Sequence, residues 1–270
     1  MGNKKNSIAL NKEEILTSLE VETASKIGND IEILESIDST NEYLLRKYGN
    51  KPEKFKFVLA ETQTAGKGTY GKSWDSPTNL GIWLSFTWEV KDKSMMSSLS
   101  IVIGIFIYQA LNKYTNTKEL KLKWPNDIYY SNQKLGGILI EQFSMLKENP
   151  NVVVGIGLNI YKNSCQTNYK KTSLSEISEV KINRNLLAAD IITKVITELN
   201  NLNINSVNNL MLVWPKFDKY YKKSISVKIG NKTISGQNIG INFDGSLKLL
   251  TTTGVVNVYQ GKILETTQKT

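Results

Sequence analysis

The sequence predicts an α+β fold: a mixed β-sheet flanked by helices over residues 31–222, followed by a small SH3-like β-barrel at 223–270. Several short stretches alternate between apolar and polar residues with a period of two, which indicates strands. Between these strands, the stretch 97–114 is apolar nearly all round, which indicates a buried helix. From residue 224 onward, short strand-like runs alternate with turn residues, which is typical of a small barrel. Residues 1–30 are expected to form an N-terminal segment with a short helix.

The first part of the chain is expected to contain two helices and one strand. Asn11, with Glu14 three residues later, forms a capping box for a helix that runs through Leu19. Residues 31–37 read as a strand. The polar residues after this strand begin a short helix that ends at Gly49.

The next segments alternate between strands and a helix. Residues 57–60 and 80–88 read as two strands on either side of a glycine-rich loop, and the buried helix follows them. Residues 119–124 alternate as a strand, which Pro125 ends, and residues 128–143 form a hairpin.

The remaining segments complete the sheet and form the barrel. Residues 152–160 are an apolar strand, and 184–202 and 207–220 are amphipathic helices, the second of which contains Pro215. The five barrel strands are predicted at 225–229, 233–235, 239–242, 247–251 and 255–259.

The composition excludes several kinds of active site. The chain has no histidine, which excludes a Ser-His-Asp triad, a Cys-His pair and a histidine-ligated zinc site. A single cysteine, Cys165, excludes an intrachain disulfide and fits a reducing cytosol, so we expect a cytoplasmic protein. The apolar run 101–108 is far too short to span a membrane, and the polar N-terminus shows no signal peptide, so no membrane association is expected. The net charge of +9 suggests nucleic acid, a membrane surface or an acidic protein as a partner, but the lysines are scattered, which favours an ordinary solvated surface.

A glycine-rich loop at residues 66–73 is a candidate phosphate-binding loop. It matches both the G-x-G-x-x-G dinucleotide pattern and the G-x-x-x-x-G-K-S pattern of P-loops. Both patterns require a helix after the loop, but here a turn with Pro77 and then a strand follow. The true P-loop and the dinucleotide site are therefore disfavoured. An ordinary glycine hairpin and an anion-binding loop both remain open.

A second polar stretch follows in the hairpin. Asn126 and Asp127 lie at a strand end behind a proline turn, and Asp127 is a hard oxygen ligand that suits Mg²⁺. Lys134 lies on the returning strand, where Gly136 and Gly137 leave room for a ligand. These residues alone favour a ligand site and a decorated surface hairpin equally.

Taken together, these stretches resemble the biotin protein ligase family in its short form, which lacks an N-terminal DNA-binding domain. The resemblance covers about residues 31–265. The pairing of Lys-Trp-Pro-Asn-Asp with Lys-Leu-x-Gly is its most specific part. The matching segments, in the family's order, are Asp-Ser-Thr-Asn at 38–41, Gln-x-Ala-Gly at 63–66 with its continuation to Trp74, Lys-Trp-Pro-Asn-Asp at 123–127, Lys-Leu-x-Gly at 134–137 and Val-Gly-Ile-Gly-Leu-Asn at 154–159.

The resemblance implies a fold like that of class II synthetases and biotin and lipoate ligases, and a two-step reaction. Biotin and Mg-ATP would give biotinyl-5′-AMP, which would then acylate one lysine of a biotin carboxyl carrier protein, as in acetyl-CoA carboxylase. ATP, Mg²⁺ and biotin are then substrates, and no tightly bound organic cofactor is implied. Charge stabilisation by lysines and backbone N–H groups suits this chemistry, which requires no histidine.

The resemblance also assigns roles to residues by matching position. Lys134 and Lys67 would be catalytic, and Asp127 would bind the metal. The implied biotin-binding residues are Ser39, Thr40, Asn41, Gln63, Lys67, Gly68, Thr69, Lys134 and Gly137. The implied ATP- and adenylate-binding residues are Gly66, Tyr70, Lys72, Trp74, Asn126, Gly155, Gly157 and Asn159.

The chain departs from the family pattern in two places. Lys67, Thr69 and Lys72 stand where the family's glycine loop usually has arginines, so bidentate phosphate contacts are lost and Thr69 carries no charge. The family often has a basic residue near the chain end, but the stretch from Leu264 offers none, so no C-terminal site residue is predicted.

The sequence disfavours several rival functions. Lipoate or octanoate ligases share the implied fold, but their sites use a histidine-bearing motif. A P-loop NTPase is less favoured, and a binding module built on the barrel would leave Lys134 without a function. Only 38 residues precede Ser39, so sequence-specific DNA binding is not expected. A homodimer is possible.

Overall fold

The computed structural model describes residues 8–116, 118–143, 149–163 and 170–264, and its core is a seven-stranded mixed sheet. The strand order is β1-β2-β3-β7-β6-β5-β4, with β1 and β2 parallel and every other neighbouring pair antiparallel. Cys165 lies outside the described residues. The strands are β1 (Ile31–Ile37), β2 (Phe57–Gln63), β3 (Gly81–Glu89), β4 (Leu120–Lys123), β5 (Asp127–Tyr130), β6 (Gln133–Phe143) and β7 (Asn151–Asn159).

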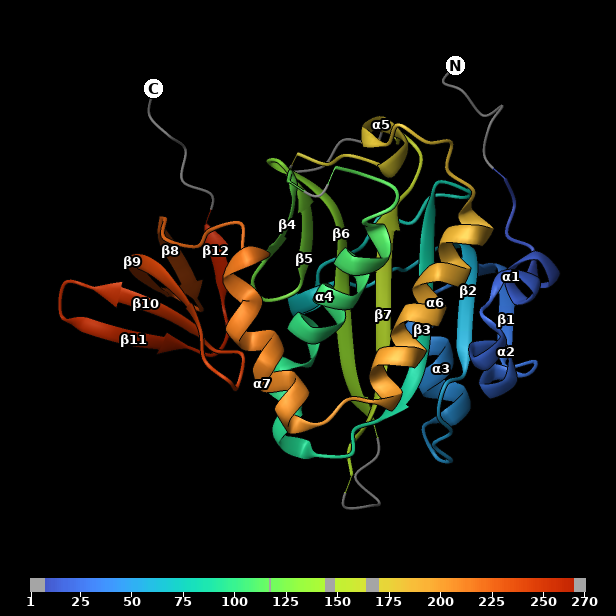
Figure 1. Ribbon diagram of the computed structural model, residues 1–270, viewed down its shortest axis with the longest axis horizontal. Coiled ribbons are helices and arrows are strands. Elements are labelled where there is room, and N and C mark those ends of the chain that lie inside the picture. Colours follow the sequence, from blue (N-terminus) through green and yellow to red (C-terminus); the bar gives the residue numbers. More distant parts are fainter. Residues whose placement is uncertain (1–7, 117, 144–148, 164–169, 265–270) are drawn as a thin grey trace.

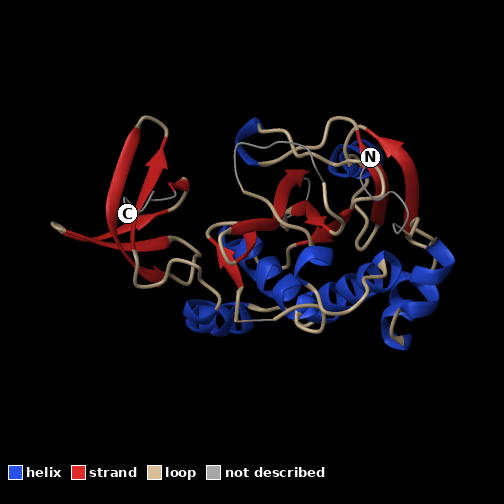
Figure 2. Ribbon diagram, turned by 90° about the horizontal axis from the view of Figure 1, so that it is seen from above, coloured by secondary structure: helices blue, strands red, loops and turns tan. Residues whose placement is uncertain are grey.

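Helices cover the two faces of this sheet unequally. The long helices α4 (Leu99–Leu111) and α6 (Arg184–Asn200) pack on one face, whereas α3 (Thr40–Tyr48) lies on the other (Figures 1 and 2). Alternation along β3 explains the division, because Ile82, Leu84 and Phe86 join the core under the long helices. The intervening side chains of β3 point to the opposite face, where the candidate site lies.

Helix α4 is the buried helix that the sequence predicts. A 3₁₀ turn at Lys93–Ser98 precedes it, and together the stretch Lys93–Leu111 is apolar and long enough to cross a membrane. However, 67% of this stretch is buried inside the structure, between the sheet and helices α6 and α7 (Ile204–Val213). The burial marks α4 as the core helix of the domain.

Two short helices precede the sheet. α1 (Lys12–Ser18) begins after Asn11, whose side chain accepts a hydrogen bond from the Glu14 backbone N–H. The predicted capping box is only half formed, because the Asn11 backbone N–H donates to Asn185 Oδ1 and not to Glu14. α2 (Val21–Ile27) was not predicted from the sequence. Both helices pack against α6, so this segment belongs to the body of the domain.

The C-terminal region forms a five-stranded antiparallel sheet, with strand order β11-β10-β9-β8-β12. The strands of this sheet differ from the predicted ones. The two strands expected at 233–235 and 239–242 are one continuous strand. The fifth strand is instead a short one that the sequence analysis missed. The strands are β8 (Ser224–Ile229), β9 (Lys232–Ile241), β10 (Leu247–Thr251), β11 (Gly254–Val258) and β12 (Lys262–Leu264).

The helix expected at 207–220 is also shorter than predicted. It ends at Val213 as α7, and a 3₁₀ turn at Trp214–Lys216 contains Pro215. Proline has no backbone N–H for the helical ladder, so the helix cannot continue regularly through it. α5 (Leu174–Ile177) is a single turn that precedes α6.

Buried polar contacts join the C-terminal sheet to the main sheet. The Trp124 indole N–H donates to the Gly245 carbonyl at 2.9 Å, and Gly245 has a φ of +79° that favours glycine. Asp218 lies between the two sheets and accepts hydrogen bonds from Trp214 Nε1 and Asn238 Nδ2 at 3.1 and 2.7 Å. Burial raises the pKa of the Asp218 carboxyl. These contacts place β12 beside the turn between β4 and β5.

Candidate active site

A cavity opens on the sheet face opposite α4 and α6, at the N-terminal end of α3. We call it the inner cavity, and strands β3, β6 and β7 form its floor. Its lining residues are Ser39, Thr40, Asn41, Gln63, Lys67, Gly68, Thr69, Trp74, Trp83, Leu84, Ser85, Asn126, Asp127, Lys134, Gly137, Ile138, Leu139, Gly155, Ile156 and Gly157.

Strand register explains why the cavity lies at this place. Gly157 pairs with Trp83 on one side and with Gly137 on the other, so two glycines adjoin in the floor. A Cβ atom on Gly157 would lie 2.6 Å from the Trp74 ring, and one on Gly155 would lie 2.4 Å from Asn41 Oδ1. Side chains at these positions would displace the residues that surround the cavity. The space therefore depends on glycine at both.

The start of α3 contributes three buried polar residues. Ser39, Thr40 and Asn41 are 2–3% exposed, and they follow β1 directly in the chain. Ser39 is the N-cap residue, yet its side chain makes no hydrogen bond to the helix backbone. The Thr40 and Asn41 side chains instead point across the sheet. All three residues line the inner cavity, and their contacts with a ligand stay a prediction.

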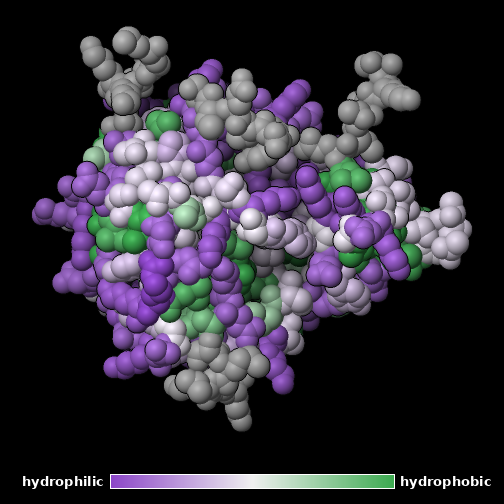
Figure 3. All heavy atoms as spheres, turned by 180° about the vertical axis from the view of Figure 1, so that it is seen from behind, coloured by the Kyte–Doolittle hydropathy of each residue, from purple (hydrophilic) through white to green (hydrophobic). Residues whose placement is uncertain are grey.

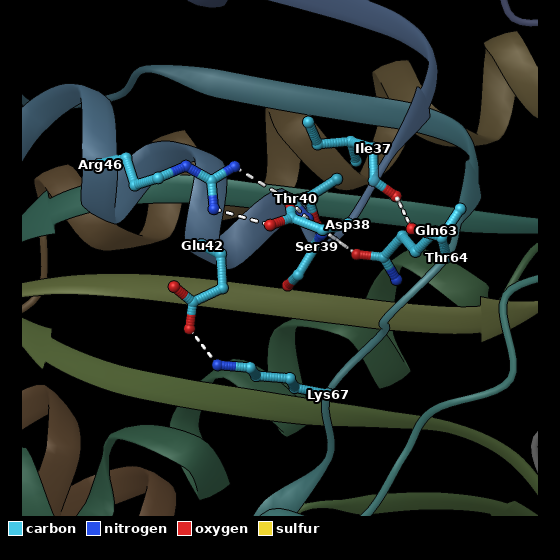
Figure 4. A network of polar contacts seen from close by, with 9 residues as sticks. All are labelled: Ile37, Asp38, Ser39, Thr40, Glu42, Arg46, Gln63, Thr64 and Lys67. Atoms are coloured by element: carbon cyan, nitrogen blue, oxygen red, sulfur yellow. Dashed lines mark hydrogen bonds and ion pairs between the residues drawn. The ribbon is translucent and has the colours of Figure 1, made fainter.

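These side chains form a continuous hydrogen-bonded series, which we call the polar chain. Its six members are Glu141, Asn41, Ser85, Thr40, Gln63 and Ser76. Gln63 Oε1 accepts from the Thr40 backbone N–H at 2.8 Å and lies 3.0 Å from the Thr40 hydroxyl (Figure 4). Gln63 Nε2 donates to Ser76 at 2.7 Å. The polar chain connects β2, β3, β6 and α3.

An exposed ion pair holds the turn between β1 and α3. Both guanidinium nitrogens of Arg46 donate to the Asp38 carboxylate, at 2.7 and 2.9 Å (Figure 4). The hydrogen bond from Arg46 lowers the pKa of Asp38 to about 2. The same carboxylate accepts from the Ser39 backbone N–H at 2.7 Å, so it fixes the entry to α3 beside the cavity.

The glycine-rich loop lies over the edge of the inner cavity. It is closed on itself by backbone hydrogen bonds from Trp74 to Gly66 at 2.8 Å and from Gly68 to Lys72 at 2.7 Å. Lys67 pairs with Glu42 of α3 across the cavity mouth (Figure 4), and that contact raises the pKa of Lys67. The loop therefore connects two strands, as the sequence predicts, and no α-helix lies between it and β3.

Lys134 lies where the inner cavity meets a second, wider opening. Its ammonium is 2.6 Å from Asp127 Oδ1 and 4.9 Å from the centroid of the Trp74 ring. Asn126 next to it bonds both backbone groups of Ile138, at 2.7 and 2.9 Å, so the turn is fixed in place. Lys134 and Asp127 expose only 16% and 22% of their side chains, which makes this a largely desolvated ion pair.

The second opening, which we call the outer groove, has a volume of about 390 Å³ and is rich in lysines. Lys72, Lys123, Lys134 and Lys262 line it, and burial together with the neighbouring Lys262 and Lys134 lowers the pKa of Lys72. Converging cations of this kind suit a polyphosphate. The full lining is Gly68, Thr69, Tyr70, Lys72, Ser73, Trp74, Lys123, Trp124, Pro125, Asn126, Asp127, Tyr129, Lys134, Gly261, Lys262, Ile263 and Leu264.

Most of the predicted site residues meet at these two openings. Six residues line both: Gly68, Thr69, Trp74, Asn126, Asp127 and Lys134. Tyr70 and Lys72 line only the outer groove, and the Tyr70 hydroxyl accepts from the Gly261 backbone N–H at 3.1 Å.

Two predicted residues line neither opening in the described structure. Gly66 is buried beneath the loop, where a Cβ atom would lie 2.5 Å from the Trp74 carbonyl. Asn159 instead donates to the Thr172 carbonyl at 3.1 Å. The predicted contacts of both residues with the nucleotide stay predictions.

The structure also adds residues that sequence reasoning missed. Ser85 and Glu141 belong to the polar chain, and Lys262 brings a cation from the C-terminal sheet, where none was predicted. The indole N–H groups of Trp74 and Trp83 are buried and have no hydrogen-bond partner within the described part of the chain. Among these missed residues, only Ser85 has a signal in the sequence: it is a polar residue within an otherwise apolar strand.

Comparison with known proteins gives a consistent result. A family model described as the biotin/lipoate A/B protein ligase family matches residues 33–159. The bifunctional ligase/repressor BirA of Escherichia coli is 31% identical over 255 residues, which cover 93% of this chain and 76% of the relative. The biotin–[acetyl-CoA-carboxylase] ligase of Mycobacterium tuberculosis is 29% identical over 170 residues, covering 61% of this chain and 62% of the relative. The solved biotin protein ligase from Aquifex aeolicus in complex with biotin and ATP has a TM-score of 0.71 at 22% identity, covering 87% of this chain and 97% of that one.

Proposed function

This chain belongs to the biotin protein ligase family, and we propose that it activates biotin with ATP and transfers the biotinyl group to a lysine of a carrier protein. The single observation that carries the proposal is the junction of the two openings at Lys134. A polar cavity for the acid and a lysine-lined groove for the triphosphate share Asp127, Lys134 and Trp74. An acid and a nucleotide that bind there would meet at their reacting ends.

The polar chain favours biotin over other acids. The ureido ring of biotin has two N–H donors and a carbonyl acceptor, which match a cavity end built from hydroxyl and amide groups. Lipoate and octanoate offer no hydrogen-bonding groups at the corresponding end, so their binding would leave these buried groups unpaired. The cavity therefore supports biotin as the substrate and disfavours the lipoate and octanoate alternatives.

In the first step, a carboxylate oxygen of biotin attacks the α-phosphorus of ATP. The bond from that phosphorus to the bridging oxygen breaks, and pyrophosphate leaves. Negative charge grows on the phosphoryl oxygens, and Lys134 is the cation at the junction that can stabilise it. Lys72 and Lys262 face the leaving pyrophosphate in this arrangement.

In the second step, the amine of the carrier lysine attacks the carbonyl carbon of biotinyl-5′-AMP. The anhydride bond breaks, AMP leaves, and the amine loses a proton. The relative from Mycobacterium tuberculosis is named for acetyl-CoA carboxylase. By extension we propose the biotin carboxyl carrier domain of that enzyme as the acceptor here. The net charge of +9 favours approach of an acidic carrier.

Asp127 fits a metal ion that arrives with ATP. Within the described residues, no group of three or more acidic, cysteine or histidine side chains is placed to hold a metal. Mg²⁺ typically needs only one or two carboxylates when phosphates supply the other oxygens. We propose that Asp127 contacts Mg²⁺ of Mg-ATP, which neutralises phosphate charge, and exchanges its present ion pair with Lys134 for that contact.

The Escherichia coli relative is named as a repressor as well as a ligase, but we do not propose a repressor function for this chain. Among the described residues before the sheet, α1 and α2 both pack on α6, and Arg184 of α6 is fully buried where it meets Glu61. Neither helix is free to enter a DNA groove. We predict that any DNA binding is salt-dependent and sequence-blind, and a gel shift with operator preference at physiological salt would contradict this.

The test of the proposed activity is pyrophosphate release with each acid in turn. Biotin should give release that depends on both the acid and ATP, whereas lipoate, octanoate and no acid should give only the background rate. Release that is equal with and without biotin would overturn the proposal and favour an ATPase. Release with lipoate or octanoate in preference to biotin would point to the other branch of the family.

A further inference from the structure

Glu141 is the member of the polar chain at the end formed by β6. It lies on β6, and its Oε2 accepts a hydrogen bond from Asn41 Nδ2 at 2.7 Å. An ionised carboxylate has no proton to donate, so the Asn41 amide must present its NH₂ group to Glu141. Its carbonyl oxygen, Oδ1, then faces the cavity and accepts from the Ser85 hydroxyl at 2.6 Å.

The other end of the polar chain is fixed in the same way. The Thr40 backbone N–H can only donate, so Gln63 must present Oε1 to it, at 2.8 Å. Gln63 Nε2 consequently points away from Thr40 and donates to Ser76. Acceptor oxygens therefore stand at both ends of the segment that contains the Ser85 and Thr40 hydroxyls.

A count of protons shows that this segment lacks one donor. Three short contacts connect its four oxygens: Asn41 to Ser85 at 2.6 Å, Ser85 to Thr40 at 2.7 Å, and Thr40 to Gln63 at 3.0 Å. Each contact needs one proton, but the two hydroxyls supply only two. In one of the three contacts, therefore, two oxygen lone pairs face each other with no proton between them. This costs free energy in a buried site.

A ligand that donates a hydrogen bond relieves this mismatch, and the groups concerned line the inner cavity. We propose that Glu141 is a specificity-determining positioning residue: by fixing the Asn41 amide, it makes the cavity select acids that carry an N–H donor. This inference rests on the proposed function, because it assigns the donor to a ureido N–H of biotin. Glu141 itself lines neither opening and acts through Asn41.

A glutamine at position 141 tests this role, because it can both donate and accept. In Glu141→Gln, the Asn41 amide can turn over and present its NH₂ group to Ser85, which completes the proton count without a ligand. The cavity would then no longer require a donor from the acid. The matched control is Glu89→Gln, which also loses a carboxylate from a strand of the main sheet, in this case one paired with Lys54. Glu89 is the last residue of β3 and lines neither opening.

The readout is the ratio of kcat/KM for pyrophosphate release with biotin to that with a lactam analogue, in which CH₂ replaces one ureido N–H. The wild type and Glu89→Gln should prefer biotin by on the order of tenfold or more. Glu141→Gln should lose most of that preference, through a higher KM for biotin with a similar kcat. Thermal unfolding checks that each variant is folded.

A second variant predicts a change in the opposite direction. Ser85→Ala removes the hydroxyl that donates to Asn41, which leaves Oδ1 more dependent on a ligand donor, so the preference for biotin should hold or increase. An unchanged ratio in a folded Glu141→Gln, or equal losses with both acids, would overturn the inference. A decreased ratio in Ser85→Ala would overturn it as well. Absence of biotin-dependent release in the wild type would instead refute the proposed function.

Discussion

Lys134 lies at the junction of the inner cavity and the outer groove, where we propose that the acid and the nucleotide meet. Lys134→Ala should leave the fold intact and nearly abolish formation of biotinyl-AMP, because it removes a charge-assisted contact worth about 1.5–3 kcal/mol or more. Single-turnover adenylate formation measures this, with Lys216→Ala, an exposed lysine outside both openings, as the control. Near-normal adenylate formation by a folded Lys134→Ala would show that another cation serves the reaction.

Asp38 gives a prediction about pH. Its pKa in the folded protein is about 2, below the ordinary value of 3.8, because Arg46 donates to it. The unfolded chain therefore binds more protons between these values, so the Asp38 contribution to stability is present above about pH 4 and is lost as the pH falls towards 2. Asp38→Asn should be less stable than wild type at pH 6, and the gap should narrow in more acidic solution. Urea unfolding at several pH values measures the difference in free energy of unfolding between the wild type and Asp38→Asn. A difference that does not change with pH would contradict the prediction.

At the scale of single residues, sequence reasoning found side chains that belong to contiguous motifs. Thr40, Gln63 and Lys134 were predicted in this way and line the inner cavity. Glu141 and Lys262 were missed for a physical reason. Glu141 acts through Asn41, a hundred positions away in the chain, and Lys262 reaches the outer groove only because the C-terminal sheet packs beside β4. Neither relationship leaves a local pattern.

At the scale of elements, the glycine-rich loop departs from the family pattern at Thr69, and this departure can be tested directly. Thr69 lies in a 3₁₀ turn, Thr69–Gly71, and lines both openings, at a position where the family resemblance implies an arginine. Thr69→Arg should slow release of biotinyl-AMP by roughly 10- to 100-fold, since a charge-assisted hydrogen bond is worth about 1.5–3 kcal/mol.

Stopped-flow dissociation of preformed adenylate, with no carrier present, measures the effect of Thr69→Arg. Equal release rates would mean that threonine does not weaken retention. In that case Lys67 and Lys72 would be the cations that hold the intermediate.

The elements themselves could be predicted where periodicity was strong and uninterrupted. The strand at 31–37 and the buried helix are examples. The division of 232–241 into two strands was wrong, because Gly236 and its polar neighbours read as a turn but continue the ladder to β8 and β10. A side chain at Gly236 would clash with the neighbouring strand, since a Cβ atom there would lie 2.7 Å from the Leu250 carbonyl. Cross-strand packing thus decided what local propensity could not.

At the scale of the whole molecule, the C-terminal sheet completes the outer groove. Lys262→Ala should raise the KM for ATP by about two- to fivefold, a modest change because the side chain is exposed and screened. The KM for biotin should not change. Lys228→Ala is the matched control, since Lys228 pairs with Lys262 across β8 and β12 but lies outside the groove. An equal effect of both variants would point to general charge and not to a specific contact.

The site face is also the face that a carrier must approach. Figure 3 shows this side of the molecule, where hydrophilic residues predominate and hydrophobic ones form smaller patches. The seven-stranded sheet positions α3, the glycine loop and the β5–β6 hairpin around the inner cavity. The chemistry of both steps is therefore expected to occur on one side of the sheet.

The most direct test of the central claim is the intact mass of a carrier domain. A biotin carboxyl carrier domain of acetyl-CoA carboxylase should gain one biotinyl group, on one lysine, when this protein, ATP and biotin are all present. Omission of ATP or biotin, or use of Lys134→Ala, should leave the mass unchanged within the same time. A carrier that stays unmodified with every component present, or that gains a lipoyl or octanoyl group in preference to biotin, would contradict the account.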